Sequence, residues 1–414
     1  MSATRVNTPF FDGGLTSIKF FNGRLLSGDD LSTEQTANIQ ARERLGLALG
    51  DGVVNGLEVT ASGSATQPTV TVQSGLAFNR SGDAVQLANT VDVGLYAPAA
   101  PAANIPSPSP FTPCGPADLG VYLSTAGVYL LTIAPASGTQ GRAPVLGLAD
   151  GSDKCNAKYL LEGVQFRLAQ LPIAASDLAN TAQLRNIVAA RCFGFTVDPL
   201  IDPFGTLPPP QRTPAPQGII EALWPDTLSL DEVPLAVVSW TANAGITFVD
   251  MWSARRRLSR SDAADDTVLP ITRRDVARGE AILLQFQDQL QSILAGSPAS
   301  FSATSAFKYL PPLGLLPLPS TASRVGFSQA TFFQGLTVTG PIDIEGARAE
   351  AMIRESFRYP PVDLSTGEMF WTFQTRQNAQ SSTARPYLFF VTGQMPYFGE
   401  ARYDVARFDY AAWT

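Results

Sequence analysis

The chain has 414 residues and a formal net charge of −7, and only 16% of its residues are charged, against about 25% in a typical globular protein. An acidic, weakly charged chain has no general attraction for phosphate backbones, so we expect no nucleic-acid partner. The 34 glycines and 32 prolines predict many turns and short strands. These numbers favour a mainly β fold with a few helices (α+β), arranged as several small antiparallel β-domains linked by proline-rich loops. Low surface charge also suits faces that neighbouring subunits cover, although neutral loops on a monomer would give the same composition.

Histidine is absent from the chain, which removes the commonest general base and the commonest metal ligand. The three cysteines, Cys114, Cys155 and Cys192, are far apart and form no CxxC pair, so no zinc site is expected. A disulfide between Cys114 and Cys155 stays open because both residues fall in turn-rich segments, but free thiols are the favoured interpretation. We therefore expect no enzyme activity, no cofactor and no metal.

The sequence shows no targeting or membrane segment. Residues 1–11 lack the basic stretch and apolar run of a secretory signal. No run of about eighteen apolar residues predicts a membrane span. The expected location is therefore cytoplasmic, at least until the protein joins a larger particle.

Residues 1–95 are predicted to form a small β-domain capped by one helix. Asp29, Asp30 and Ser32 supply capping side chains, and Ser32 and Gln35 have the spacing of a capping box. Capping explains Asp29 and Asp30, while a calcium or partner site is the alternative for this pair. Short strands are expected at 53–59, at 69–72 and from Val85 onward.

Residues 96–258 are predicted to form a second β-rich domain with proline-rich loops at 97–116 and 199–216. Residues 177–190 have the pattern of a helix. Alternating and continuous apolar runs predict strands at 127–133 and 163–168, and a hairpin formed by 233–240 and 245–250.

Residues 259–414 are predicted to begin with a polar linker, 259–267, followed by a helix, 272–294, and a C-terminal β-rich domain. Within the helix, Val276, Leu283 and Leu290 are seven residues apart, which gives a narrow seam suited to another helix. Burial of this seam within its own domain is the favoured interpretation, and an additional contact with a neighbouring chain is the alternative.

Two groups of residues are candidate assembly contacts. On the long helix they are Phe286, Gln287 and Gln291. The basic run Arg255, Arg256 and Arg257 is the second group; it could dock on an acidic neighbour or form part of a solvated linker.

The first 90 residues or so resemble structural proteins of phage tails and contractile injection systems. In those proteins an aromatic-x-Gly-x-Leu-Leu segment precedes an acidic helix start, then a Gly-Val-Val-x-Gly-Leu-x-Val turn and strand. This order appears here at 21–26, at Asp29-Asp30 with Glu34-Gln35, and at 52–59, and strand and glycine-turn segments at 70–75 and 82–85 complete it. Fainter similarities extend to 145–146, 164–168, 233–240, 248–250, 308–314 and 360–364.

The resemblance implies a baseplate, cap or fibre-anchoring role, with other particle subunits as partners and a homo-oligomer or ring within the assembly. A receptor- or carbohydrate-binding fibre protein is the alternative, for which Trp371, Phe373, Phe389 and Phe390 could form a stacking platform. Carboxylate pairs such as Asp250 with Asp226, or Glu345 with Glu350, have no spacing that distinguishes a glycosidase.

Overall fold

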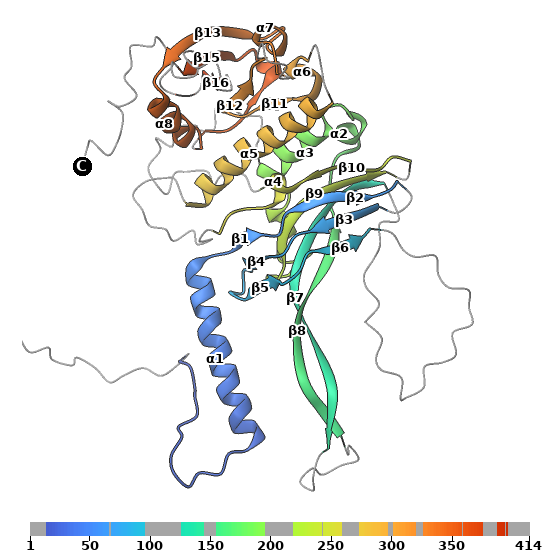
Figure 1. Cartoon of the computed structure of the whole chain (residues 1–414), viewed down its shortest axis with the longest axis vertical. Helices are drawn as coiled ribbons and strands as arrows, with labels where there is room; N and C mark the ends of the chain where they lie inside the picture. The colour runs from blue at the N-terminus through green and yellow to red at the C-terminus, as the bar shows by residue number, and fades with distance from the viewer. Residues whose placement is uncertain are drawn as a thin grey trace, which may run out of the picture.

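The fold is taken from a computed structural model, which describes residues 14–65, 68–95, 126–144, 155–194, 218–241, 243–258, 273–296, 301–319, 326–357, 359–375, 387–393 and 395. The described residues form helices and several small sheets, and nearly all strand pairs are antiparallel (Figure 1). The predicted mainly β fold with a few helices is therefore confirmed. The predicted loops at 97–116 and 199–216 and the predicted linker at 259–267 lie outside the described residues.

The N-terminal part begins with helix α1 (Gly28–Leu49). Six short strands follow and form two three-stranded sheets, in the orders β1-β4-β5 and β2-β3-β6. Their bounds are Gly52–Gly56 (β1), Val59–Gly63 (β2), Pro68–Val72 (β3), Gly75–Phe78 (β4), Ala84–Leu87 (β5) and Val91–Gly94 (β6).

A four-stranded antiparallel sheet of order β10-β9-β7-β8 lies against these short strands. Its strands are β7 (Gly127–Pro144), β8 (Cys155–Gln170), β9 (Val233–Thr241) and β10 (Gly245–Asp250). The predicted β9–β10 hairpin is confirmed. Strands β7 and β8 are much longer than predicted and continue as a pair far beyond the part of β7 that pairs with β9.

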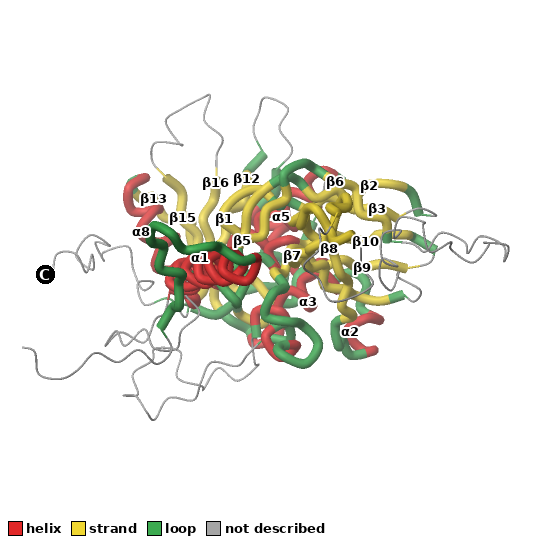
Figure 2. Tube along the Cα trace, turned by 90° about the horizontal axis from the view of Figure 1, so that it is seen from below, coloured by secondary structure: helices red, strands yellow, loops and turns green. Residues whose placement is uncertain are grey.

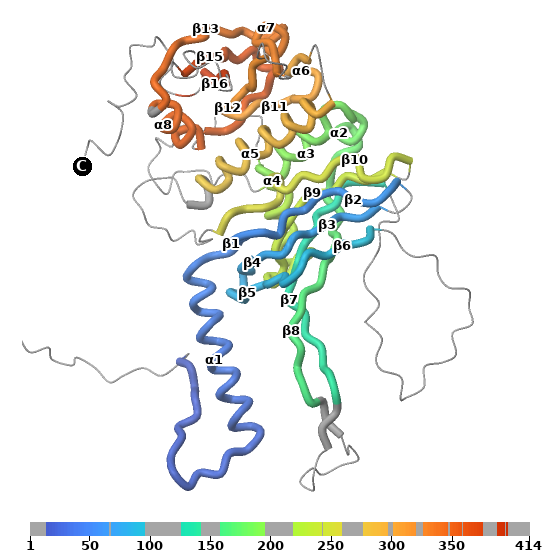
Figure 3. The backbone as a smooth tube through the Cα atoms, viewed as in Figure 1, coloured from blue at the N-terminus to red at the C-terminus, as the bar shows by residue number. Residues whose placement is uncertain are grey.

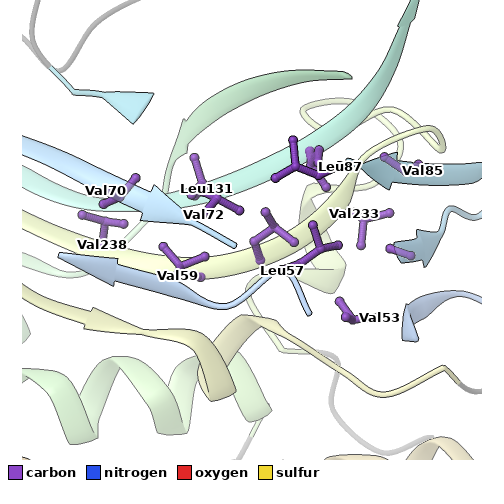
Figure 4. Close-up of a cluster of buried hydrophobic side chains, with 14 of the residues drawn as sticks. Val53, Leu57, Val59, Val70, Val72, Val85, Leu87, Leu131, Val233 and Val238 are labelled. Atoms are coloured by element: carbon purple, nitrogen blue, oxygen red, sulfur yellow. The ribbon is translucent and has the colours of Figure 1, made fainter. Parts of the chain in front are cut away.

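One hydrophobic core joins the short sheets to the four-stranded sheet. Val53, Leu57 and Val70 pack with Leu131 and Val238, as Figure 4 shows. Alternate residues of a strand point to one face, so Val164, Phe166 and Leu168 of β8 reach this core together. Because the core contains residues from both sides of position 95, the predicted separation of 1–95 from 96–258 is wrong at the level of the core.

Helices cover the other face of the four-stranded sheet. The predicted helix at 177–190 is divided into α2 (Ala175–Ala179) and α3 (Leu184–Phe193), and α4 (Met251–Ala254) follows β10 directly. A short 3₁₀ helix, Glu221–Leu223, lies beside them. Val188 and Cys192 of α3 and Ala254 of α4 pack there on Val128 and Leu130 of β7.

The C-terminal part is organised around helix α5 (Arg273–Ala295) and a four-stranded sheet of order β12-β16-β15-β13. The sheet strands are β12 (Leu313–Pro317), β13 (Thr337–Ile344), β15 (Met369–Thr375) and β16 (Tyr387–Thr392), and β13 runs parallel to β15. The remaining elements are α6 (Ala303–Ala306), α7 (Gln329–Phe332), α8 (Gly346–Ser356), the small pair β11 (Tyr309–Leu310) and β14 (Val362–Asp363), and a 3₁₀ helix, Leu364–Thr366. Helix α5 lies between this sheet and helices α3 and α4 (Figure 1).

Candidate assembly surface

Two elements project from the same side of the molecule, helix α1 and the end of the β7–β8 hairpin (Figures 1 and 3). Figure 2, seen from that side, shows α1 nearly end-on and apart from the hairpin. With 22 residues, α1 is about 33 Å long at 1.5 Å per residue. These projections and their side chains form the candidate site.

Helix α1 contacts the body of the molecule at its C-terminal end. A Cβ on Gly46 would lie 1.9 Å from the carbonyl oxygen of Gly82, so the helix and the β4–β5 turn approach as closely as glycine allows. Toward its N-terminus, Ala37 is the only buried residue of α1 before Gly46. Most of the helix therefore stands clear of the described body.

The N-terminus of α1 is capped one turn earlier than the sequence predicts. Ser27 is the N-cap: the amide of Asp30 donates to its hydroxyl, and the amide of Ser27 donates to the Asp30 carboxylate at 2.9 Å. The predicted capping pair is wrong, because Ser32 lies inside the helix, where its hydroxyl donates to the carbonyl of Gly28, and Gln35 is exposed. Asp29 and Asp30 both lie in the first turn, where carboxylates favour the positive end of the helix dipole.

Asp30 also holds the segment that precedes the helix. Arg24 forms an ion pair with Asp30 at 2.6 Å, and the amide of Ile18 donates to the carboxylate of Glu34 at 3.0 Å. The hydrogen bond from the Ser27 backbone is the largest effect that keeps the pKa of Asp30 below its ordinary value of 3.8. Residues 14–27, here called the leading segment, are thereby fixed beside α1.

The leading segment and α1 expose many large apolar side chains. Leu25 is 93% exposed and Phe21 is 62% exposed. The other exposed members of this group are Leu15, Phe20, Leu26, Leu31, Ile39, Leu45, Leu47 and Leu49. Several of them, Phe20, Phe21, Leu25 and Leu26, are close together in the sequence, and clustered exposed apolar residues mark interaction sites.

The second projection is a two-stranded ribbon. Beyond Ile133, which pairs with Val233 of β9, β7 pairs with β8 alone among the described strands. This ribbon, residues 134–144 with 155–165, is about 35 Å long at the usual rise of a strand. Its base touches the body, where Ala134 is buried and Val164 packs on the core; the rest is here called the free-standing ribbon. It carries the exposed apolar residues Tyr159, Leu160 and Leu161.

The predicted contacts on α5 lie within the protein. Phe286 is 1% exposed, in a core with Phe307 and Phe390, and the side-chain amide of Gln287 donates to the carbonyl of Leu315 on β12. Phe286 and Gln287 therefore make contacts inside the protein, and their prediction as assembly contacts is wrong. Gln291 is exposed. Of the heptad seam, Leu283 and Leu290 are buried in the C-terminal core clusters, whereas Val276 is 40% exposed.

The basic run also makes internal contacts. Arg256 donates to the carbonyls of Trp252 and Ser253 and lies 5.0 Å from the ring of Phe193. Burial is the main cause that lowers the pKa of Arg255. Arg257 pairs with Glu280 of α5 at 3.0 Å but keeps an exposed side chain. Residues 255–257 therefore form neither a solvated linker nor a free docking patch.

Asp250 is the centre of a buried polar network rather than one half of a catalytic pair. It is fully buried, it caps α4 through the amide of Ser253, and it accepts from Arg185 and Gln285 at 2.9 Å each. Arg185 also binds Asp288, and its two carboxylates raise the pKa of the guanidinium against the opposing effect of burial. The network joins α3 and α4 to α5, whereas Asp226 is exposed.

The aromatic residues considered for sugar stacking are mostly core residues. Phe373, Phe389 and Phe390 are buried in two clusters on the faces of the C-terminal sheet, and Trp371 is half-buried. The stacking platform that was the alternative for these residues is therefore not formed by this sheet.

No metal site or membrane helix is found among the described residues. Within them, no group of histidine, cysteine or acidic residues is arranged to hold a metal ion, and no helix is both long and apolar enough to cross a membrane. Cys192 is a buried free thiol whose pKa is raised by burial; Cys114 and the side chain of Cys155 lie outside the described part.

No protein-family model and no curated protein matches this sequence.

Proposed function

We propose that the chain is a non-enzymatic structural component of a phage-tail-like contractile injection particle, where it joins baseplate, cap or fibre proteins through protein–protein interfaces. In this proposal the protein is cytoplasmic until the particle assembles and then belongs to the particle, as part of a homo-oligomer or ring. The observation that carries the proposal is the apolar surface of α1 and the leading segment.

That surface is more easily explained by a partner than by the isolated chain. Isolated helices are marginal in water, since most helical stability comes from tertiary packing. Yet α1 packs on the body near Gly46, and its leading segment leaves Phe20, Phe21 and Leu25 exposed. A partner that covers these side chains would supply the missing packing.

The sequence resemblance falls on the same element. The segments similar to tail proteins, 21–26, Asp29-Asp30 with Glu34-Gln35, and 52–59, form the tip, the start and the base of the α1 projection. The part of the chain that supports a particle role therefore also carries most of the large exposed apolar side chains among the described residues. The low proportion of charged residues agrees with faces that become buried.

Incorporation into particles tests this proposal. The double change Phe21→Ser with Leu25→Ser should leave the melting temperature unchanged, because both side chains are exposed. The variant should be incorporated at least about tenfold less than the parent, since such apolar anchors carry much of an interface's binding energy. Leu230→Ser, at an exposed apolar position elsewhere on the body, is the matched control and should be incorporated normally. Normal incorporation of the double variant would contradict the proposal.

A further inference from the structure

No strand in the described part of the chain pairs with the outer edge of β8. Strand β8 pairs with β7 on one side and is the last strand in its sheet. We propose that the free-standing ribbon binds a second copy of this chain by antiparallel pairing of β8 with β8, around a two-fold axis at Leu160. The inference rests on the proposed function because it treats the projections as assembly surfaces. It concerns only the pairing of one copy of this chain with another.

The two edges of the ribbon differ in their capacity to pair. Proline cannot donate a ladder hydrogen bond, and β7 has Pro135 and Pro144 within the ribbon. No proline occurs in β8. An exposed strand edge without such protection is a template for another strand, so β8 is the edge that can accept one.

The sequence of β8 is complementary to itself around Leu160. In this register Leu160 lies opposite Leu160 of the second copy, and Tyr159 lies opposite Leu161. Lys158 then faces Glu162 twice, once on each side of the axis. All three exposed apolar residues of the ribbon gain an apolar partner, and both charged residues of 158–162 gain an opposite charge. Directly opposed pairs of these kinds stabilise antiparallel strands.

The length of the ribbon fits the same register. Pairing around Leu160 brings Cys155 opposite Gln165, and these residues are the two ends of β8 within the ribbon. The next residue, Phe166, pairs with Ile133 at the border of the four-stranded sheet. The two copies can therefore pair over the whole ribbon. The product is a four-stranded sheet, whereas an isolated two-stranded ribbon is only marginally stable, and the interface is isologous, as in most dimers.

Charge exchange tests the register. Sedimentation equilibrium of the purified full chain should show a monomer–dimer equilibrium. Lys158→Glu and Glu162→Lys should each raise the dimer dissociation constant at least about tenfold, because each creates two like-charge pairs. The double exchange should restore the parent value. Glu350→Lys, an exposed site on α8, is the control and should dimerise like the parent. A parent that is monomeric at every concentration, or single variants that dimerise normally, would overturn the inference.

Disulfide cross-linking tests the position of the two-fold axis directly. With Cys114 and Cys155 changed to serine, Leu160→Cys should give a covalent dimer on mild oxidation. Thr139→Cys is the matched control because Thr139 lies opposite Leu160 on β7, which places its counterpart about 14 Å away, beyond disulfide reach. No cross-link at 160, or equal cross-linking at 139, would contradict the pairing. Neither assay uses particles, so failure here is distinguishable from failed particle incorporation of the α1 variant.

Discussion

At the scale of single residues, Ser27 decides where the first helix begins. Ser32 and Gln35 have the capping-box spacing in the sequence, but Ser27 and Asp30 have it too, with aspartate as the acidic member. Sequence spacing alone does not decide between these two capping boxes. The box formed by Ser27 and Asp30 is further stabilised by the ion pair between Asp30 and Arg24.

Replacement of the two serines separates these alternatives. Ser27→Ala should lower the free energy of opening the first turn by about 0.5–2 kcal/mol, the usual effect of a lost N-cap. Ser32→Ala should have a smaller effect, because the Ser32 hydroxyl bonds within the helix and alanine is a better helix former. Hydrogen exchange of amides 29–33 measures both. Equal protection in the two variants would show that Ser27 is not the cap.

Asp30 should make the start of α1 sensitive to acid. Its pKa in the folded protein is below the ordinary value of 3.8, so its stabilising contribution is complete above pH 3.8. The contribution is lost as the pH falls through the lower, folded pKa. The Cα chemical shifts of residues 29–33 should therefore lose helical character in this acid range, and Asp30→Asn should remove that pH dependence. The same loss of helical character with acid in the parent and in Asp30→Asn would contradict the account.

At the scale of elements, sequence patterns predict many helices and strands but not what lies against them. The helices 28–49 and 273–295 and the β9–β10 hairpin follow from caps, periodicity and turn residues. The long ribbon was not predicted, because Pro135, Gly138 and Gly141 weaken the strand signal of β7 and cross-strand pairing with β8 overrides it. The spacing of Val276, Leu283 and Leu290 likewise predicted a seam, with burial in its own domain as the favoured interpretation. Leu283 and Leu290 are buried there, whereas Val276 is exposed.

The attachment of α1 gives a prediction for this element. Gly46→Val should destabilise the protein by about 1–3 kcal/mol, because the added side chain collides with the backbone of Gly82. Gly28→Ala is a control in the same helix, since nothing lies within 4 Å of a Cβ there. Denaturant unfolding of both variants gives the comparison. Equal stability of Gly46→Val and the parent would mean that α1 does not rest on the β4–β5 turn.

At the scale of the whole molecule, two sets of sheets are joined by helices α3, α4 and α5. Ala189 and Phe193 of α3 pack on Ala281 and Ile282 of α5, beside the polar network around Asp250. The predicted boundary between 257 and 272 separates residues of different hydrophobic clusters. Helix α5, however, packs both on α3, which precedes this boundary, and on the C-terminal sheet, which follows it. Sequence analysis could not foresee this junction, because Arg185, Asp250 and Asp288 are far apart in the chain and each resembles an ordinary surface charge.

Loss of Asp250 should weaken this junction. Asp250→Ala leaves Arg185 and the amide of Ser253 without their buried acceptor, which should cost about 3–5 kcal/mol. Asp226→Ala, at an exposed carboxylate, should change stability by less than about 0.5 kcal/mol. Thermal unfolding compares the two variants, and similar melting temperatures would show that the network does not hold the parts together.

The central claim, that the leading segment and α1 are an assembly surface, is tested most directly by a photo-cross-linking residue at Leu25 in assembled particles. Leu25 is almost fully exposed in the isolated chain, so every cross-link to another subunit reports a contact made on assembly. The account predicts an efficient cross-link from position 25 to a neighbouring subunit and little or none from the same probe at Leu230. Particles that contain the probe at position 25 but show no intermolecular cross-link above that of position 230 would contradict it.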